Sequence, residues 1–204
     1  MTNPTPVRSP SRVGGVSARA RSLVLVEGQS DRAAVETLAR RLGRDLDDEG
    51  VQVVALGGAT NVGRFLVETA AAESAVRLAG LYDAKEERYF RRGLERAGHG
   101  FVPDRERLED LGFFACVDDL EDELIRALGV PAVESVIEEQ GELASLRILQ
   151  HQPAQRTRTT EQHLHRFLGT RSGRKSAYAE LLVEAVDLER MPRPLTAVLE
   201  RTLA

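Results

Sequence analysis

The sequence predicts an α/β protein with a mainly parallel sheet of about four strands. Short runs rich in Val, Leu and Phe alternate with longer segments in which apolar residues recur at helical spacing. Strands that alternate with helices form βαβ units, whose right-handed crossovers place helices on both faces of a parallel sheet. The predicted strands are 23–26, 51–56, 76–82 and 113–117.

The helical segments divide the chain into three parts. Helices are expected from Ser30 and Asp31 to about residue 42, from residue 61, at 85–97 and at 121–128, whereas the charged segment 104–110 is expected to be a connector. After residue 129 no strand pattern occurs, and five helical segments follow: 131–140, 142–150, 161–168, 172–188 and 195–203. The predicted organisation is a disordered tail (1–21), a catalytic α/β domain (22–128) and a helical C-terminal extension (129–204).

Composition limits the class of protein. The 204 residues are 42% hydrophobic and 29% charged, with a net charge of −4. No run approaches the ~20 apolar residues of a membrane span, and residues 1–21 lack the apolar core of a secretory signal, so we expect a cytoplasmic protein without membrane contact. The net negative charge gives no general attraction to nucleic acid, so any such contact must come from local arginines or from bound metal ions. Of 28 basic residues only Lys85 and Lys175 are lysines, which suggests that these positions require lysine.

Acidic residues stand where three of the four predicted strands end. Glu27 follows the first strand, Asp83 the third, and Asp118 and Asp119 the fourth. Asp31 comes four residues after Glu27, in the first turn of the next helix. In parallel sheets, ligand sites form beyond the carboxyl ends of the strands. Negative charge gathered there requires compensation, and a divalent cation is one candidate.

The segment Leu25-Val-Glu-Gly-Gln-Ser-Asp31, followed by Gly80-Leu-Tyr-Asp83, resembles the Toprim domain. This is the metal-binding fold of type IA and II topoisomerases, bacterial primases, small RNA-maturing nucleases and OLD-family nucleases. The OLD-family version is the most similar, and the resemblance covers residues 22–128 and reaches the C-terminal part only through one lysine. The matching features are Asp31 four residues after Glu27, the turn Gly57-Gly58, the pair Leu120-Glu121 and the downstream Lys175.

The resemblance implies a Mg²⁺- or Mn²⁺-dependent endonuclease that hydrolyses nucleic acid, with DNA the expected substrate. Two ions about 4 Å apart would neutralise charge on the attacked phosphate and on the leaving oxygen. Glu27 and Asp31, helped by Glu121, would hold one ion, and Asp83 with Glu86 would hold or bridge the other. The expected catalytic residues are Glu27, Asp31, Asp83 and Lys175, and the expected metal ligands are Glu27, Asp31, Asp83, Glu86 and Glu121.

Phosphate binding is expected at Gly57 and Gly58, whose amides precede a helix, and at Arg174. Turn geometry alone is an equally good explanation of the two glycines. Arg174 and Lys175 have a second interpretation as part of a basic patch with Arg171. His99, His151, His163 and His165 do not have zinc-site spacing and are expected to be surface residues.

Each acid also has an interpretation without metal. Glu27 fits a solvated strand end, Asp31 is favourable at a helix N-terminus, and Asp83 fits a helix cap. Glu86 fits an i, i+4 pair with a helical arginine. The chain also departs from the Toprim pattern, because Lys85 stands where the second acid of Asp-x-Asp is usual. The alternative functions are therefore a non-catalytic or single-metal module that binds nucleic acid or a protein, and a nucleotidyl or phosphoryl transferase.

Partners follow from the same resemblance. OLD-family proteins usually carry an ATPase domain before the Toprim part, but no Gly-x4-Gly-Lys-Ser/Thr motif occurs in this chain. A stand-alone Toprim domain that does not hydrolyse ATP is therefore expected. An ATPase partner acting in trans and a homodimer are the two protein partners left open.

Overall fold

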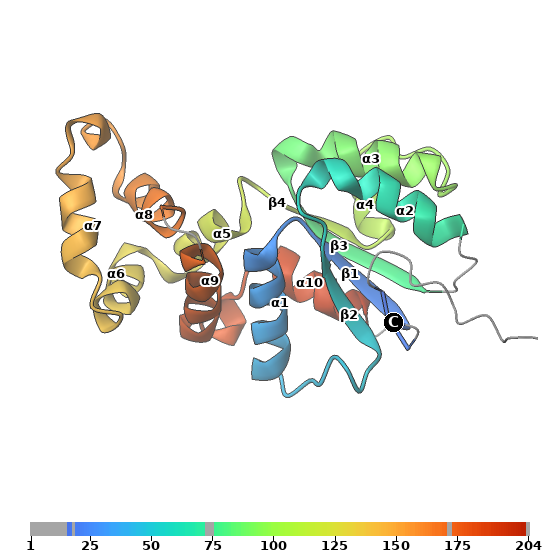
Figure 1. Ribbon diagram of the computed structural model, residues 1–204, viewed down its shortest axis with the longest axis horizontal. Coiled ribbons are helices and arrows are strands. Elements are labelled where there is room, and N and C mark those ends of the chain that lie inside the picture. The colour runs from blue at the N-terminus through green and yellow to red at the C-terminus, as the bar shows by residue number, and fades with distance from the viewer. Residues whose placement is uncertain (1–15, 18, 72–75, 171–172, 203–204) are drawn as a thin grey trace, which may run out of the picture.

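A four-stranded parallel sheet in the order β2-β1-β3-β4 forms the centre of the computed structural model (Figure 1). The structure describes residues 16–17, 19–71, 76–170 and 173–202. The strands are β1 (Ser22–Val26), β2 (Val51–Ala55), β3 (Arg77–Asp83) and β4 (Phe113–Cys116). In register, Val24 of β1 lies opposite Val53 of β2 and Ala79 of β3. The predicted α/β class and parallel sheet are confirmed.

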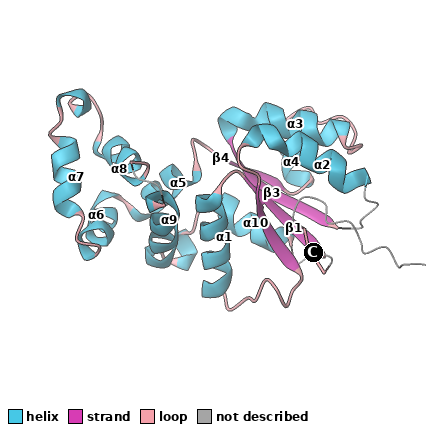
Figure 2. Ribbon diagram, in the orientation of Figure 1, coloured by secondary structure: helices cyan, strands magenta, loops and turns pink. Residues whose placement is uncertain are grey.

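Helices cover both faces of the sheet (Figure 2). Successive side chains of β1 point to opposite faces, as the two-residue period of a strand requires. Leu23 and Leu25 join the core beneath α2 and α3, whereas Val24 and Val26 join the core beneath α1 and α10. The bounds of these helices are α1 (Gln29–Arg41), α2 (Val62–Ala71), α3 (Glu87–Arg96), α4 (Arg105–Asp110) and α10 (Arg193–Arg201).

The C-terminal helices first leave the sheet and then return to it (Figure 1). The helices of this lobe are α5 (Leu120–Leu128), α6 (Val130–Glu139), α7 (Leu143–Gln150) and α8 (Thr160–Leu168). Helix α9 (Arg174–Ala185) then packs along α1, and α10 packs on β3 and β4. The Arg41 side chain at the end of α1 donates hydrogen bonds to the carbonyls of Val183 and Val186, both at 2.6 Å. This contact aligns α9 with α1, so the first turns of the two helices lie at the same end.

Two elements differ from the sequence prediction. The segment 104–110 is not an irregular connector: it contains α4, because the Asp104 side chain accepts a hydrogen bond from the Arg107 amide and caps the helix. Helix α1 begins at Gln29, one residue before the predicted opening at Ser30, and Asp31 bonds back to the Gly28 amide at 2.8 Å and stabilises the first turn. Shorter 3-10 turns lie at Ala59–Asn61, Ala84–Glu86, Pro153–Gln155 and Leu188–Arg190.

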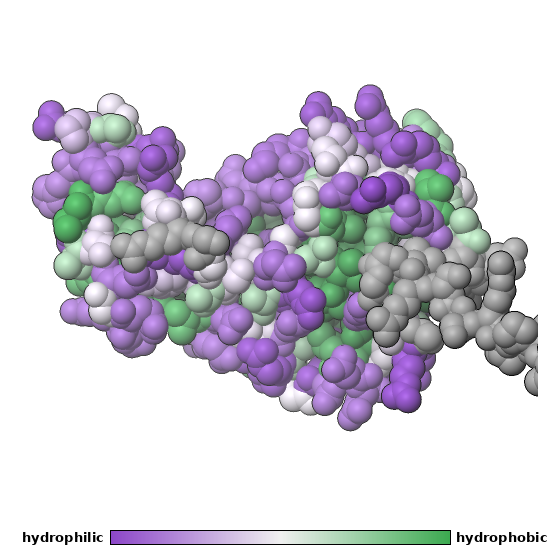
Figure 3. Space-filling view, in the orientation of Figure 1, coloured by the Kyte–Doolittle hydropathy of each residue, from purple (hydrophilic) through white to green (hydrophobic). Residues whose placement is uncertain are grey.

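The ends of the predicted divisions are only partly described. Residues 1–15 and 18 of the predicted tail lie outside the described residues, while the Arg21 amide donates to the Gly50 carbonyl at 2.7 Å. The predicted boundary at 128/129 stays a prediction, and buried residues of the lobe and of the sheet form one continuous core. Figure 3 shows polar residues over most of one face, with hydrophobic residues gathered over the sheet beside α1. None of the described helices is long and apolar enough to cross a membrane.

Candidate metal centre

A polar pocket of about 320 Å³ opens at the carboxyl ends of the strands. Glu27 follows β1, Asp83 ends β3, and the first turn of α5 follows β4. Helix α9 contributes its first turn from the other end of the chain. The pocket therefore brings together most of the predicted site residues. Its lining includes Glu27, Asp31, Asp83, Lys85, Asp119, Glu121 and Lys175.

The turn after β2 positions Glu27. The amides of Gly57 and Gly58 donate hydrogen bonds to the Glu27 carbonyl at 3.0 and 3.1 Å. The two glycines have φ angles of +70° and +119°, which favour glycine because it has no Cβ. The expectation that these amides bind phosphate is wrong, because both are already bonded within the protein. The two glycines instead anchor the backbone of the strand-end glutamate.

Asp31 has one oxygen bonded and an elevated proton affinity. Its Oδ2 accepts the Gly28 amide at 2.8 Å, which is the helix-start role that the sequence offered as an alternative to metal binding. The pKa of Asp31 is raised to about 7, chiefly by burial and next by the nearby Glu121, although the Gly28 amide and Lys175 act in the opposite direction. The helix-start contact therefore does not compensate the charge of this carboxylate.

Glu121 is the most deeply buried acid of the pocket, with 2% of the residue exposed. Its Oε2 lies 3.0 Å from Nζ of Lys175, and its Oε1 is buried without a hydrogen-bond partner among the described residues. Burial alone would lower the pKa of Lys175, but Glu121, Asp119 and Asp31 raise it overall, so the lysine stays cationic at neutral pH. A buried carboxylate with an unbonded oxygen is costly unless a cation completes its coordination.

A second group of acids lies at the end of β3. Carboxylate oxygens of Glu27, Asp83 and Glu86 lie within 4.8 Å of one another. Burial, followed by the nearby Glu86, raises the pKa of Glu27. Burial also raises the pKa of Asp83, although Lys85 opposes this with its Nζ 3.1 Å from Asp83 Oδ2. Oε2 of Glu86 is buried and has no hydrogen-bond partner within the described chain.

The capping alternative does not account for Asp83, because its side chain accepts no capping hydrogen bond from a backbone amide of the turn that follows β3. The donor set of the pocket consists of carboxylate oxygens, the hard ligands that Mg²⁺ and Mn²⁺ prefer. Two of these acids carry unbonded buried oxygens, and three others have raised pKa values. The residues thus fit a hard divalent cation.

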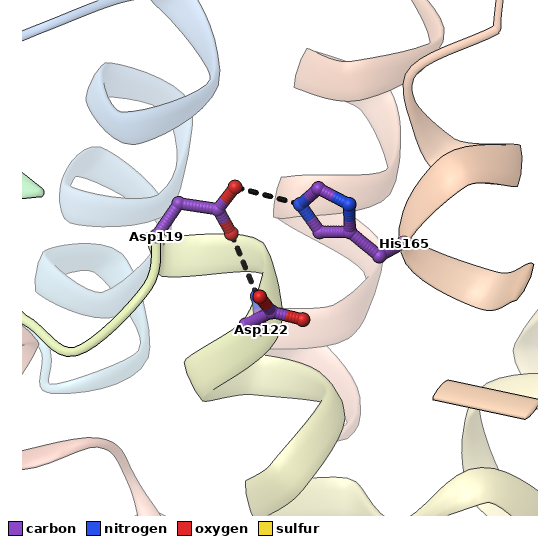
Figure 4. A group of neighbouring side chains, drawn as sticks. All are labelled: Asp119, Asp122 and His165. Carbon is purple, nitrogen blue, oxygen red and sulfur yellow. Dashed lines mark hydrogen bonds and ion pairs between the residues drawn. The ribbon is translucent and has the colours of Figure 1, made fainter. Parts of the chain in front are cut away.

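Sequence reasoning missed the role of Asp119 and His165. The sequence places Asp119 among the acids at the strand ends without a specific role, and His165 is expected on the surface. Instead Asp119 lines the pocket, accepts the Asp122 amide at 2.9 Å, and lies 2.6 Å from Nε2 of the half-buried His165 (Figure 4). An aspartate just before Leu120 is a recognisable helix-cap signal, but no local pattern connects it with a histidine 46 residues later.

Arg174 corrects a further expectation. Only 8% of this residue is exposed, and its guanidinium donates to Glu142 Oε1 at 2.5 Å and stacks 4.2 Å from the centre of the Phe167 ring. It points into the helical lobe and away from the pocket, so its predicted phosphate-binding role is contradicted. Arg171 of the predicted basic patch lies outside the described residues.

Known proteins share this architecture. Residues 20–74 match the family described as "Overcoming lysogenization defect protein-like, TOPRIM domain". The C-terminal region of the OLD protein of Xanthomonas campestris pv. campestris is 24% identical; the match covers 90% of this chain and 94% of that one, with a TM-score of 0.66. The C-terminal region of the Burkholderia pseudomallei OLD protein is 22% identical, with coverages of 90% and 97% and a TM-score of 0.61. None of the curated proteins compared with the chain matches it.

Proposed function

Because the chain carries a Toprim domain of the OLD type, we propose that it is a divalent-metal-dependent nuclease that hydrolyses phosphodiester bonds in nucleic acid, with DNA as the expected substrate. The observation that carries the proposal is the convergence of carboxylates with uncompensated charge beside Lys175, in one open pocket at the strand ends. Two lysines pair with Glu121 and Asp83, but the acids of the pocket outnumber these two cations, so negative charge remains for metal ions to compensate.

The acids form two groups, one for each ion of a two-metal mechanism. Asp31 and Glu121 make up the first group. Glu27, which the resemblance assigns to the same ion as Asp31, lies within 4.8 Å of Asp83 and Glu86 and joins them in the second group. When bound, Mg²⁺ or Mn²⁺ supplies the positive charge that polarises a phosphate and lowers the pKa of a water molecule.

The protein's own cation has a separate role. Lys175 keeps its positive charge next to Glu121 and is about half exposed to the pocket, so its Nζ offers charge stabilisation to a phosphate undergoing attack. Exposed Arg88, Arg92 and Arg96 on α3, in the segment after β3, offer contacts to the phosphate backbone of a longer substrate. Such contacts predict binding that weakens as salt concentration rises.

The test is cleavage of supercoiled plasmid in Mg²⁺ or Mn²⁺, with an equal amount of structured RNA as a second substrate. Wild-type protein is expected to nick the plasmid, and chelation by EDTA is expected to abolish nicking. Glu27→Ala should reduce the rate at least about 100-fold, since removal of one preorganised charge-stabilising group typically costs that much or more. Glu68→Ala is the matched control, because Glu68 is an exposed glutamate on α2, outside the pocket.

Three results would count against the proposal. Absence of nicking by the wild type, or equal nicking by wild type and Glu27→Ala, would contradict it. Cleavage of RNA alone would contradict the DNA assignment and leave the nuclease activity supported.

An ATPase partner in trans and a homodimer remain predictions. Activity in the presence of a purified ATPase tests the first, and size-exclusion chromatography tests the second.

A further inference from the structure

The only two lysines among the chain's 28 basic residues both line the proposed metal pocket. Lys175 pairs with Glu121, in the first group of acids, whereas Lys85 pairs with Asp83, in the second group. Arginine serves as the cation nearly everywhere else in the sequence. The ammonium group is compact and forms single-point contacts, whereas a guanidinium is a planar fork, so the two are not interchangeable in a small carboxylate cluster.

The Lys85 ammonium lies beside the second group of acids, Glu27, Asp83 and Glu86, which we call the second carboxylate cluster. The residue belongs to the 3-10 turn Ala84–Glu86 that follows β3, and its Nζ lies 3.1 Å from Oδ2 of Asp83. The hydrogen bond to Asp83, followed by the charges of Asp83, Asp119 and Glu86, raises the pKa of Lys85 despite its partial burial, so it is cationic at neutral pH. The side chain is 68% exposed, which leaves the ammonium free to move away from Asp83.

The position of Lys85 changes the charge of the cluster by two units. In the Asp-x-Asp pattern that the sequence departs from, this position carries a negative charge. Here it carries a positive one, so Glu27, Asp83 and Glu86 face a tethered cation in place of a fourth carboxylate. A divalent ion that binds Oδ2 of Asp83 must displace the Lys85 ammonium from that oxygen, just as an ion that binds Oε2 of Glu121 must displace Lys175 in the first group.

We propose that Lys85 is a built-in cation of the second carboxylate cluster and lowers the affinity of that cluster for divalent metal. This inference rests on the proposed function for the existence of the metal sites, and it assigns a residue that sets the affinity of one of them. A metal ion binds there only at a higher concentration than it would without the ammonium, because Lys85 already neutralises part of the charge at Asp83.

The experiment is a calorimetric titration of the EDTA-treated full chain with Mn²⁺, without nucleic acid. Wild-type protein should bind Mn²⁺ at both groups of acids. Lys85→Gln should tighten one binding event at least about tenfold, the lower end of what groups around a metal site contribute to its affinity. Lys85→Arg should leave that event as in the wild type because the positive charge is retained.

Arg64→Gln is the matched control. It removes the same charge from an exposed side chain on α2 that does not line the pocket, and it should titrate like the wild type. Because Lys85 is largely exposed, its substitution should leave the thermal unfolding temperature nearly unchanged. Identical titrations of wild type and Lys85→Gln, or equal tightening by Arg64→Gln, would overturn the proposal.

The outcome is separable from that of the nuclease proposal because metal binding is read without substrate. Tightening by Lys85→Gln in a protein that fails to nick plasmid would support the role of Lys85 and contradict the nuclease. If the protein nicks plasmid but its Mn²⁺ affinity is the same with and without Lys85→Gln, the nuclease is supported and the role of Lys85 is contradicted.

Discussion

The pocket carboxylates and the Asp119–His165 contact are neighbouring arrangements of acidic side chains that differ in how completely their charge is compensated. In the pocket, Glu86 and Glu121 carry buried oxygens without hydrogen-bond partners in the described part of the chain, and burial raises the pKa of Asp31 to about 7. At the contact between α5 and α8, both oxygens of Asp119 are bonded. Burial alone would raise the pKa of Asp119, but His165 and the Asp122 amide lower it to about 2.

This difference separates a candidate reaction centre from a structural junction. Ligand atoms of Asp119, Asp122 and His165 lie as close together as those of Glu27, Asp83 and Glu86 (Figure 4). Proximity of acids alone therefore does not identify a metal site. The junction needs no ion, because Asp119 caps α5 and also binds His165, which attaches α8 to α5, the helix that carries Glu121. Uncompensated charge is the property that singles out the pocket.

The largest predicted effect concerns an ion pair outside the pocket whose charges are compensated, Arg174 with Glu142. Arg174→Met should lower the free energy of unfolding by about 3 kcal/mol, because it leaves Glu142 without the buried partner that lies 2.5 Å away. Urea denaturation measures this loss, and Mn²⁺ binding should stay unchanged because Arg174 does not line the pocket. Unchanged stability combined with weaker DNA binding would instead restore the phosphate-binding role.

An intermediate effect is expected at the junction. His165→Gln should destabilise the protein by about 1 to 2 kcal/mol near pH 5.5, since the charged hydrogen bond to Asp119 is partly screened by solvent. The folded-state pKa of His165 is raised, chiefly by that bond, so its contribution is present below the unfolded pKa and is lost as pH rises through the folded value. The contribution of Asp119, whose pKa is lowered to about 2, is present above its unfolded pKa of 3.8 and lost as pH falls toward 2.

Thermal unfolding of wild type and His165→Gln at pH 5.5 and pH 9 measures how the contribution of His165 to stability depends on pH. The difference between wild type and His165→Gln should be larger at pH 5.5. A difference that grows toward pH 9 would mean that the pair is not an ionic contact.

The smallest effect has the opposite sign. Asp31→Asn should stabilise the metal-free protein by up to about 1 kcal/mol at pH 8, because it removes an uncompensated charge and keeps an oxygen for the Gly28 amide. The pKa of Asp31 is raised from 3.8 to about 7, so wild type loses stability as pH rises between these values. In EDTA, thermal unfolding should show the gain at pH 8 and no gain at pH 4. Destabilisation at pH 8 would show that the charge of Asp31 is already satisfied without metal.

The sequence alone was sufficient for the sheet and for the acids that follow its strands. Strand periodicity placed Glu27 and Asp83 at strand ends, and parallel strands bring their carboxyl ends to one edge. The helix at 105–110 was missed because it depends on a single side chain, that of Asp104, which bonds back to a backbone amide. Such contacts are weak signals in a pattern built on hydrophobic spacing.

Only the tertiary structure decided which polar groups are free to act. The amides of Gly57 and Gly58 and the guanidinium of Arg174 looked available, and all are bonded within the protein. Lys175 reaches Glu121 because α9 lies along α1, a packing that no local sequence pattern encodes. Residue type and strand position are local properties of the chain, whereas compensation of charge depends on partners far away in the sequence. The acids at the strand ends were thus foreseeable, and the uncompensated charge that makes them a candidate metal centre was not.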